Sequence, residues 1–207
     1  ATGADADAVL HGMGLDSRIG AKFLRPGPGW GGSCFPKDAR ALNALASELD
    51  VPMPLVHAAI DSNARARARV VGMVSDGVGG DLAGKRIAAW GLAFKANTDD
   101  VRESPALAVI HDLVSQGAHV VGHDPVAHVA PHSGFEQADS ALDAVRGAHA
   151  LVVLTEWPDY ATVSAPDVLA AMSGNTVVDA RGILDRQAYR DRKSTRLNSS
   201  HVKRSRM

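Results

Sequence analysis

Short apolar runs alternate with helix-forming segments in the second half of the chain, and this alternation restricts the fold more than any other feature of the sequence. The apolar runs cover residues 86–91, 118–125, 150–155 and 176–179. The helix-forming segments between them cover residues 105–115, 141–145 and 166–172. Because the connections are short, strands and helices in this order predict an α/β fold with a doubly wound parallel sheet.

Polar residues stand at the end of each predicted strand or just beyond it. They are Lys95, Asp124, Thr155 and Arg181. Sheets of this kind bind ligands beyond the carboxyl ends of their strands, so these residues predict a nucleotide site at that edge. Taken by itself, Lys95 is also read as an ordinary surface lysine that follows a strand.

The first part of the chain has helical periodicity. Apolar spacing, with proline and glycine as boundaries, predicts helices over about residues 4–13, 36–50 and 55–78. The arginines of the third helix alternate with alanine and spread around its surface, which favours a solvated face over a phosphate site. The predicted division of the chain is a helical region, residues 1–79, an α/β region, residues 80–190, and a tail, residues 191–207.

Cys34 is the only cysteine of the chain, and its setting is unusual for a core residue. It follows a glycine-rich turn and precedes Pro36, a residue type favoured at the start of a helix. A helix N-terminus and the nearby Lys37 both favour a thiolate, and Asp38 places a carboxylate within the same turn. A nucleophile beside an acid/base group is the minimal arrangement for covalent catalysis. The alternative is that Cys34 is a small buried hydrophobe.

Composition excludes some classes of function. The 207 residues are 45% hydrophobic and 22% charged, with a formal net charge of −1, which gives no reason to expect nucleic-acid or anionic-membrane partners. No apolar run approaches the roughly 20 residues of a membrane span. A single cysteine excludes an intramolecular disulfide and suits a reducing compartment, so a cytoplasmic location is expected. The nine histidines show no ligand spacing with a carboxylate partner, so no metal site is predicted.

The segment from Asp16 to Asp38, which contains Gly-Pro-Gly-Trp-Gly-Gly-Ser-Cys-Phe-Pro-Lys-Asp, resembles the active-site segment of the nucleotide-sugar 6-dehydrogenases. Three further blocks, at residues 90–105, 155–157 and 179–181, follow in the order found in this family. Four blocks in register, across roughly residues 1 to 189, are far more specific than any one of them. Within the family, the form of the cysteine block leans towards the members that act on UDP-glucose.

The resemblance implies an NAD-dependent enzyme that oxidises UDP-glucose to UDP-glucuronate in two hydride transfers. Cys34 would form first a thiohemiacetal and then a thioester, and Asp38 would position or activate the water that releases the product. The sister activities, on GDP-mannose or a UDP-N-acetylhexosamine, remain alternatives. The resemblance also implies a homodimer that forms through the helical region.

The resemblance assigns further roles residue by residue. Arg18 would reach the sugar in the partner subunit's site, and Phe94 and Lys95 would hold the substrate. The implied substrate-binding residues are Arg18, Phe23, Gly29, Gly31, Gly32, Phe94, Lys95 and Arg181, and those on the cofactor side are Lys37 and Arg102. The plain alternatives are that Arg18 is a solvated cation and that Arg102 forms a surface ion pair with Glu103.

The sequence contains no G-x-G-x-x-G after a predicted strand, whereas family members bind NAD with an N-terminal Rossmann domain. This chain opens on Ala1 in mid-pattern and looks like the C-terminal half of such an enzyme. By itself it is expected to be a non-catalytic module that dimerises and binds a UDP-sugar. The basic tail from about residue 191 reads like a translated sequencing adapter, and the competing interpretation is a disordered tail that binds nucleic acid or acidic partners.

Overall fold

The computed structural model describes residues 4–21 and 24–190. Its helices are α1 (Ala6–Gly14), α2 (Phe35–Glu48), α3 (Pro54–Gly77), α4 (Pro105–Ser115), α5 (Ala141–Val145), α6 (Pro158–Thr162), α7 (Ala165–Ala171) and α8 (Arg186–Arg190). Its strands are β1 (Arg86–Trp90), β2 (His119–His123), β3 (Phe135–Gln137), β4 (Ala150–Val153) and β5 (Thr176–Asp179). The expected tail, residues 191–207, lies outside the described residues.

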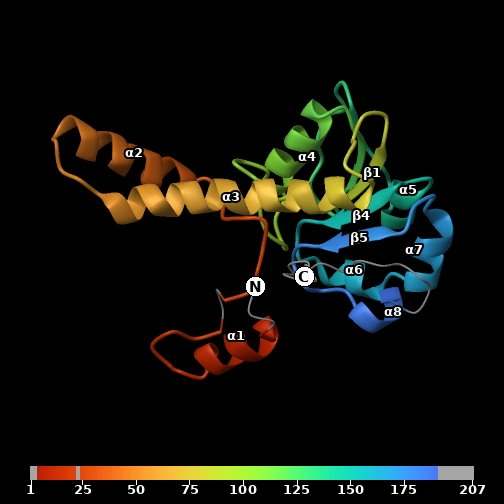
Figure 1. The fold of residues 1–207 in the computed structure, drawn as a ribbon, viewed down its shortest axis with the longest axis horizontal. Coiled ribbons are helices and arrows are strands. Elements are labelled where there is room, and N and C mark those ends of the chain that lie inside the picture. Colours follow the sequence, from red (N-terminus) through yellow and green to blue (C-terminus); the bar gives the residue numbers. More distant parts are fainter. Residues whose placement is uncertain (1–3, 22–23, 191–207) are drawn as a thin grey trace, which may run out of the picture.

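The strands form one parallel sheet in the order β3-β2-β1-β4-β5, which confirms the doubly wound fold. The chain adds β2 and β3 on one side of β1 and then crosses to add β4 and β5 on the other (Figure 1). The point of reversal therefore lies between the carboxyl ends of β1 and β4, where sheets of this kind bind ligands. The four apolar runs correspond to β1, β2, β4 and β5, whereas β3 was not expected.

Helices cover both faces of the sheet (Figure 1). On one face α4 and the C-terminal part of α3 pack against the strands, with Val70, Val74 and Leu113 fully or almost fully buried. On the other face α5, α7 and α8 enclose a core that includes Trp90, which stacks on Tyr160 of α6 at a ring separation of 4.9 Å. Because helices cover both faces, the strands need apolar side chains on both sides, and this is why they appear in the sequence as near-continuous apolar runs.

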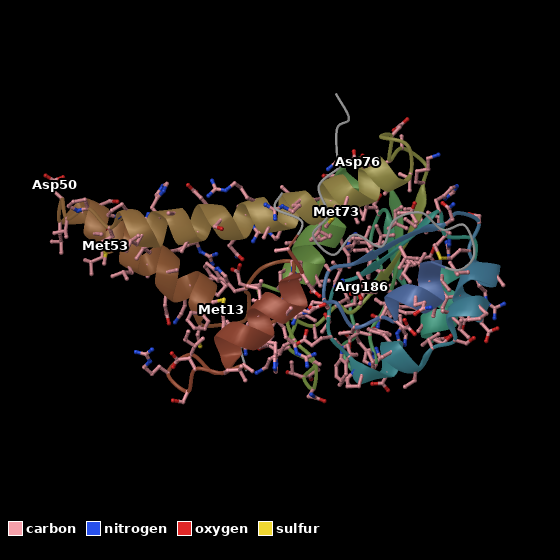
Figure 2. All side chains as sticks on the ribbon, turned by 60° about the horizontal axis from the view of Figure 1, so that its bottom comes forward. Met13, Asp50, Met53, Met73, Asp76 and Arg186 are labelled. Carbon is pink, nitrogen blue, oxygen red and sulfur yellow. The ribbon has the colours of Figure 1, made fainter. Side chains whose placement is uncertain are left out.

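Helix α3 joins two parts of the molecule. It contains 24 residues, so it is about 36 Å long. Figure 2 shows Asp50 and Met53 at the tip of the hairpin formed by α2 and α3, far from Met73 and Asp76 beside the sheet. The hairpin projects away from the α/β region, and none of the described helices is long and apolar enough to cross a membrane.

The projecting part of the molecule leaves many large apolar side chains exposed. Leu55 is 85% exposed and Phe35 is 74% exposed, although both belong to helices. The others on the hairpin are Leu42, Leu45, Leu49 and Val51, and a separate group in and after α1 consists of Val9, Met13, Leu15 and Ile19. Such a concentration is unusual on a free surface and typical of a face that another protein surface covers.

Asp124, directly after β2, holds the ends of three strands together. Its Oδ2 accepts hydrogen bonds from the backbone N–H groups of Leu92 and Ala93, at 2.8 and 3.0 Å, and from the indole Nε1 of Trp157, at 3.1 Å. Its Oδ1 accepts two more, from the N–H groups that follow at residues 126 and 127. Trp157 is buried. The carboxyl edge of the sheet is therefore fixed by one buried carboxylate.

Replacing Asp124 with alanine is expected to lower the free energy of unfolding by about 3 kcal/mol or more, because buried N–H donors would lose their acceptor. Denaturant titration of the chain measures this. The matched control is Asp139→Ala, which removes an exposed carboxylate from the same region and is expected to change stability by no more than about 0.5 kcal/mol. Equal stability of the two variants would contradict the role assigned to Asp124.

Candidate functional site

The glycine-rich loop, residues 25–33, passes between α3 and the carboxyl edge of the sheet. A Cβ atom on Gly31 would lie 2.3 Å from the carbonyl oxygen of Glu103, so no side chain fits there. Gly32 has a φ of +87° and lies against the ring of Phe94, which follows β1. The loop therefore brings its backbone into contact with the strand ends, as close approach of glycines allows.

Cys34 is exposed and lies directly before α2, at the N-cap position. Its carbonyl oxygen accepts a hydrogen bond of 2.8 Å from the N–H of Asp38, which is the first bond of the helix. The hydroxyl of Ser33 lies 3.6 Å from the sulfur. The interpretation of Cys34 as a buried core residue is therefore wrong, and the predicted position at a helix N-terminus is confirmed.

Lys37 and Asp38 lie on the first turn of α2 and form an ion pair of 3.2 Å with each other. Both side chains are largely exposed. Asp38 also borders an apolar groove of about 600 Å³ between α2 and the start of α3, together with Phe35, Leu42 and Leu55. The structure thus places a carboxylate and an ammonium group one helical turn from the thiol.

Arg102 pairs with Asp100 and not with Glu103. Its guanidinium donates hydrogen bonds of 2.9 and 2.8 Å to the Asp100 carboxylate, and Glu103 instead accepts from Arg40 at 2.7 Å. The surface pair expected between Arg102 and Glu103 is therefore wrong. Hydrogen bonds from Arg102 lower the pKa of Asp100 from 3.8 to about 2. The same hydrogen bonds, followed by the charge of Asp100, raise the pKa of Arg102.

Phe94 and Lys95 follow β1 and meet the loop. The Lys95 ammonium lies 5.1 Å from the centre of the Phe94 ring, whose other edge contacts Gly32. The hydroxyl of Thr155, after β4, donates a hydrogen bond of 2.7 Å to the carbonyl of Ala93. The ends of β1 and β4 are thus joined directly beneath these residues.

Arg181, beyond β5, forms an ion pair with Glu156, beyond β4, and its side chain is only 15% exposed. Its Nε has no hydrogen-bond partner in the described structure, and its guanidinium lies against Gly27 of the loop. Arg25 and Arg181 border two adjoining pockets of about 450 and 340 Å³. Two guanidinium groups beside glycine backbone form a suitable environment for a phosphate-bearing ligand.

The structure does not bring every predicted residue to this region. Arg18 is 87% exposed and pairs with Asp16 on its own segment at 2.6 Å. The described contacts do not connect it with Cys34 or with the strand ends, in agreement with a solvated cation within one chain. Phe23 lies outside the described residues.

Asn63 of α3 is a site residue that the sequence reasoning missed. Its Oδ1 accepts a hydrogen bond of 2.7 Å from the N–H of Trp30, and its Nδ2 donates one of 3.1 Å to the Trp30 carbonyl. The side chain is 8% exposed. The available signal was its spacing, since Asn63 stands seven residues before Val70 and so shares the buried face of the helix.

Sequence models of two domains of one family match this chain. The central domain of the UDP-glucose/GDP-mannose dehydrogenase family matches residues 1–65, and its UDP binding domain matches residues 88–186. The chain belongs to this family. Membership accounts for the combination of a cysteine loop, a helical hairpin and a doubly wound sheet in one short chain.

Curated relatives carry the same assignment. The UDP-glucose 6-dehydrogenase of Rhizobium meliloti is 42% identical over 87% of this chain, and the UDP-glucose 6-dehydrogenase AglM of Haloferax volcanii is 43% identical over 93%. Among solved structures, a UDP-glucose dehydrogenase from Pyrobaculum islandicum is 32% identical over 87% of this chain, with a TM-score of 0.77. These relatives are nucleotide-sugar dehydrogenases, and the chain spans 42%, 44% and 41% of their lengths.

The Arg102→Ala variant is expected to return the pKa of Asp100 from about 2 towards 3.8, because the hydrogen bonds from Arg102 are its main cause. The folded-state pKa is depressed, so the pair stabilises the fold above about pH 4 and this contribution is lost as the pH falls towards 2. NMR titration of the Asp100 carboxyl carbon measures the shift. Arg40→Ala, which removes the partner of Glu103, should leave the titration unchanged. An unaltered Asp100 titration in Arg102→Ala would contradict the assignment.

Proposed function

We propose that this chain carries the thiol loop and the nucleotide-sugar site of an NAD-dependent UDP-glucose 6-dehydrogenase, an enzyme that oxidises UDP-glucose to UDP-glucuronate. The observation that carries the proposal is an exposed cysteine on a glycine loop that packs against the carboxyl edge of a doubly wound sheet. The names of the relatives in the family support the same substrate. A single cysteine and the absence of any described membrane-spanning helix are in keeping with work in the cytoplasm.

The Cys34 thiolate is the nucleophile in this proposal. The C6 alcohol first loses a hydride and a proton and becomes an aldehyde. The thiolate adds to the aldehyde carbon, and the oxygen takes up a proton to form a thiohemiacetal, from which loss of a second hydride and a proton gives a thioester. Water then attacks the thioester carbon, and the thiol leaves with a proton as the carboxylate forms. Asp38, one turn further along α2, is suited to orient that water. Covalent attachment keeps the sugar in place between the two oxidations.

The nucleotide sugar is held, in this proposal, across the strand ends and the loop. Lys95 provides a compact positive charge beside the Phe94 ring, and Arg181 adds a guanidinium at the border of the pockets beyond β5. Gly29, Gly31 and Gly32 let the loop backbone approach the sugar without side chains in the way. Pockets on both sides of Arg181 supply room for the ligand.

The cofactor side is proposed from the exposed cations near the thiol. Lys37 and Arg102 are 71% and 70% exposed, so both fit contacts with a phosphate or a polar cofactor group. NAD supplies the hydride acceptor for both oxidations when it is bound. The sequence has no G-x-G-x-x-G after a strand, so we propose that this chain by itself binds the UDP-sugar without oxidising it.

A homodimer is the proposed assembly. The exposed apolar side chains of α2 and of the start of α3, among them Leu45, Leu49 and Leu55, favour burial against a second copy of the hairpin. Arg18 has no described contact with the site of its own chain and is 87% exposed, which suits a role in the partner's site.

Calorimetric titration of UDP-glucose into the chain tests the substrate. Wild-type chain is expected to bind it saturably, and Lys95→Ala is expected to weaken binding about fivefold to tenfold, because a phosphate-binding charge is lost. Lys85→Ala is the matched control, since Lys85 precedes β1 at the opposite edge of the sheet and should leave the Kd unchanged.

Competing substrates decide the remaining alternatives. Tighter binding of GDP-mannose or a UDP-N-acetylhexosamine than of UDP-glucose would move the assignment to a sister activity of the family. Failure of a folded wild-type chain to bind any of the three ligands would contradict the nucleotide site proposed here.

A further inference from the structure

The loop that precedes the thiol has few hydrogen bonds that fix its path. Among the described residues, the backbone groups of residues 25–33 form no hydrogen bond with other backbone groups. The hydrogen bonds that the described structure gives to this backbone are the two between Trp30 and Asn63. A loop of this kind is free to move unless a neighbouring side chain holds it.

Asn63 is suited to hold the loop because the oxygen and the nitrogen of its side-chain amide both bind the same residue. Its oxygen accepts from the Trp30 N–H at 2.7 Å, and its nitrogen donates to the Trp30 carbonyl at 3.1 Å. Gly29 lies so close that a Cβ atom there would be 2.4 Å from the Asn63 oxygen. The two hydrogen bonds hold the N–H of one peptide unit and the C=O of the next, so they fix both the position and the orientation of the backbone at Trp30.

Asn63 is itself fixed relative to the sheet. It lies on α3 seven residues, or about 10 Å, before Val70, which is buried against the strands together with Val71 and Val74. Trp30 lies four residues before Cys34. Helix α3 therefore fixes the thiol loop relative to the strands of the sheet.

We propose that Asn63 is a positioning residue, which holds the glycine loop so that the Cys34 thiol faces a sugar bound at the carboxyl edge of the sheet. This inference rests on the proposed function and extends it to a residue outside the thiol loop and the strand ends. Asn63 acts through the Trp30 peptide and does not touch the reacting atoms.

The test uses the single cysteine as a reporter. The rate of Cys34 alkylation by iodoacetamide is measured with and without saturating UDP-glucose, and UDP-glucose binding is measured by calorimetry. Wild-type chain is expected to be protected about tenfold by UDP-glucose, because the bound sugar covers the thiol. Asn63→Leu, which has nearly the same shape and neither hydrogen bond, is expected to keep the Kd within about threefold but to lose protection to below about twofold.

Two further variants separate positioning from general stability. Asn63→Asp keeps the acceptor for the Trp30 N–H and is expected to retain more protection than Asn63→Leu. Thr176→Val removes the 2.8 Å hydrogen bond from the Thr176 hydroxyl to the Gly77 carbonyl at the far end of α3. It is expected to lower stability and leave the protection of Cys34 unchanged. Wild-type protection in Asn63→Leu, or equal loss in Thr176→Val, would overturn the proposal.

Hydrogen exchange keeps this test separate from the substrate assignment. In the absence of ligand, the amide of Trp30 is expected to exchange at least about tenfold faster in Asn63→Leu than in wild type, while those of β1 do not change. If wild-type chain fails to bind UDP-glucose, the proposed function fails, and exchange still decides whether Asn63 holds the loop. Unchanged exchange at Trp30 would overturn the inference in either case.

Discussion

The rest of the structure depends on helix α3, which is buried against the sheet at one end and against the glycine loop further along. Val70, Val71 and Val74 of α3 are buried against the sheet, and Asn63 on the same helix is buried against the glycine loop. Because an α-helix is stiff over two turns, the loop and the sheet cannot shift independently of each other. The thiol and the strand ends therefore share one frame, although more than 50 residues separate Cys34 from β1.

The loop itself is shaped by its neighbours and not by its own backbone. Gly31 contacts the backbone at Glu103, Gly32 contacts Phe94, and Gly27 contacts the Arg181 guanidinium. Two of these contacts join the loop to residues 90–105, and the third joins it to residues 179–181. Blocks that lie far apart in the sequence therefore meet at one place in the fold. A side chain at Gly31 would separate the loop from the segment that precedes α4.

The sequence predicted four of the five strands of the sheet and missed β3. The apolar runs of β1, β2, β4 and β5 are long enough to stand out, whereas β3 has three residues, of which Phe135 is the buried one. Cys34 was located correctly because a glycine turn and Pro36 are local signals. Asn63 and Glu156 were missed because their partners, Trp30 and Arg181, lie 33 and 25 residues away in the sequence. Local sequence patterns do not indicate pairs that are so far apart. The pairing of Arg102 was misjudged for a related reason. Glu103 has a φ of +49°, so the backbone turns there and Glu103 meets Arg40 of α2.

The cations around the thiol differ in how firmly their ion pairs hold them. Lys37 pairs with Asp38, and both side chains are largely exposed, so the pair contributes little to stability and Lys37 is able to turn towards a phosphate at small cost. Arg102 is held more firmly, because the Asp100 side chain is only 19% exposed and accepts two hydrogen bonds from the guanidinium. Arg181 differs, because its side chain is 15% exposed and Glu156 already occupies one face of the guanidinium. Glu156 keeps that guanidinium in place next to Gly27. Fixed guanidinium groups beside one movable ammonium group suit the proposed ligand, whose nucleotide end is held firmly and whose sugar end must reach the thiol.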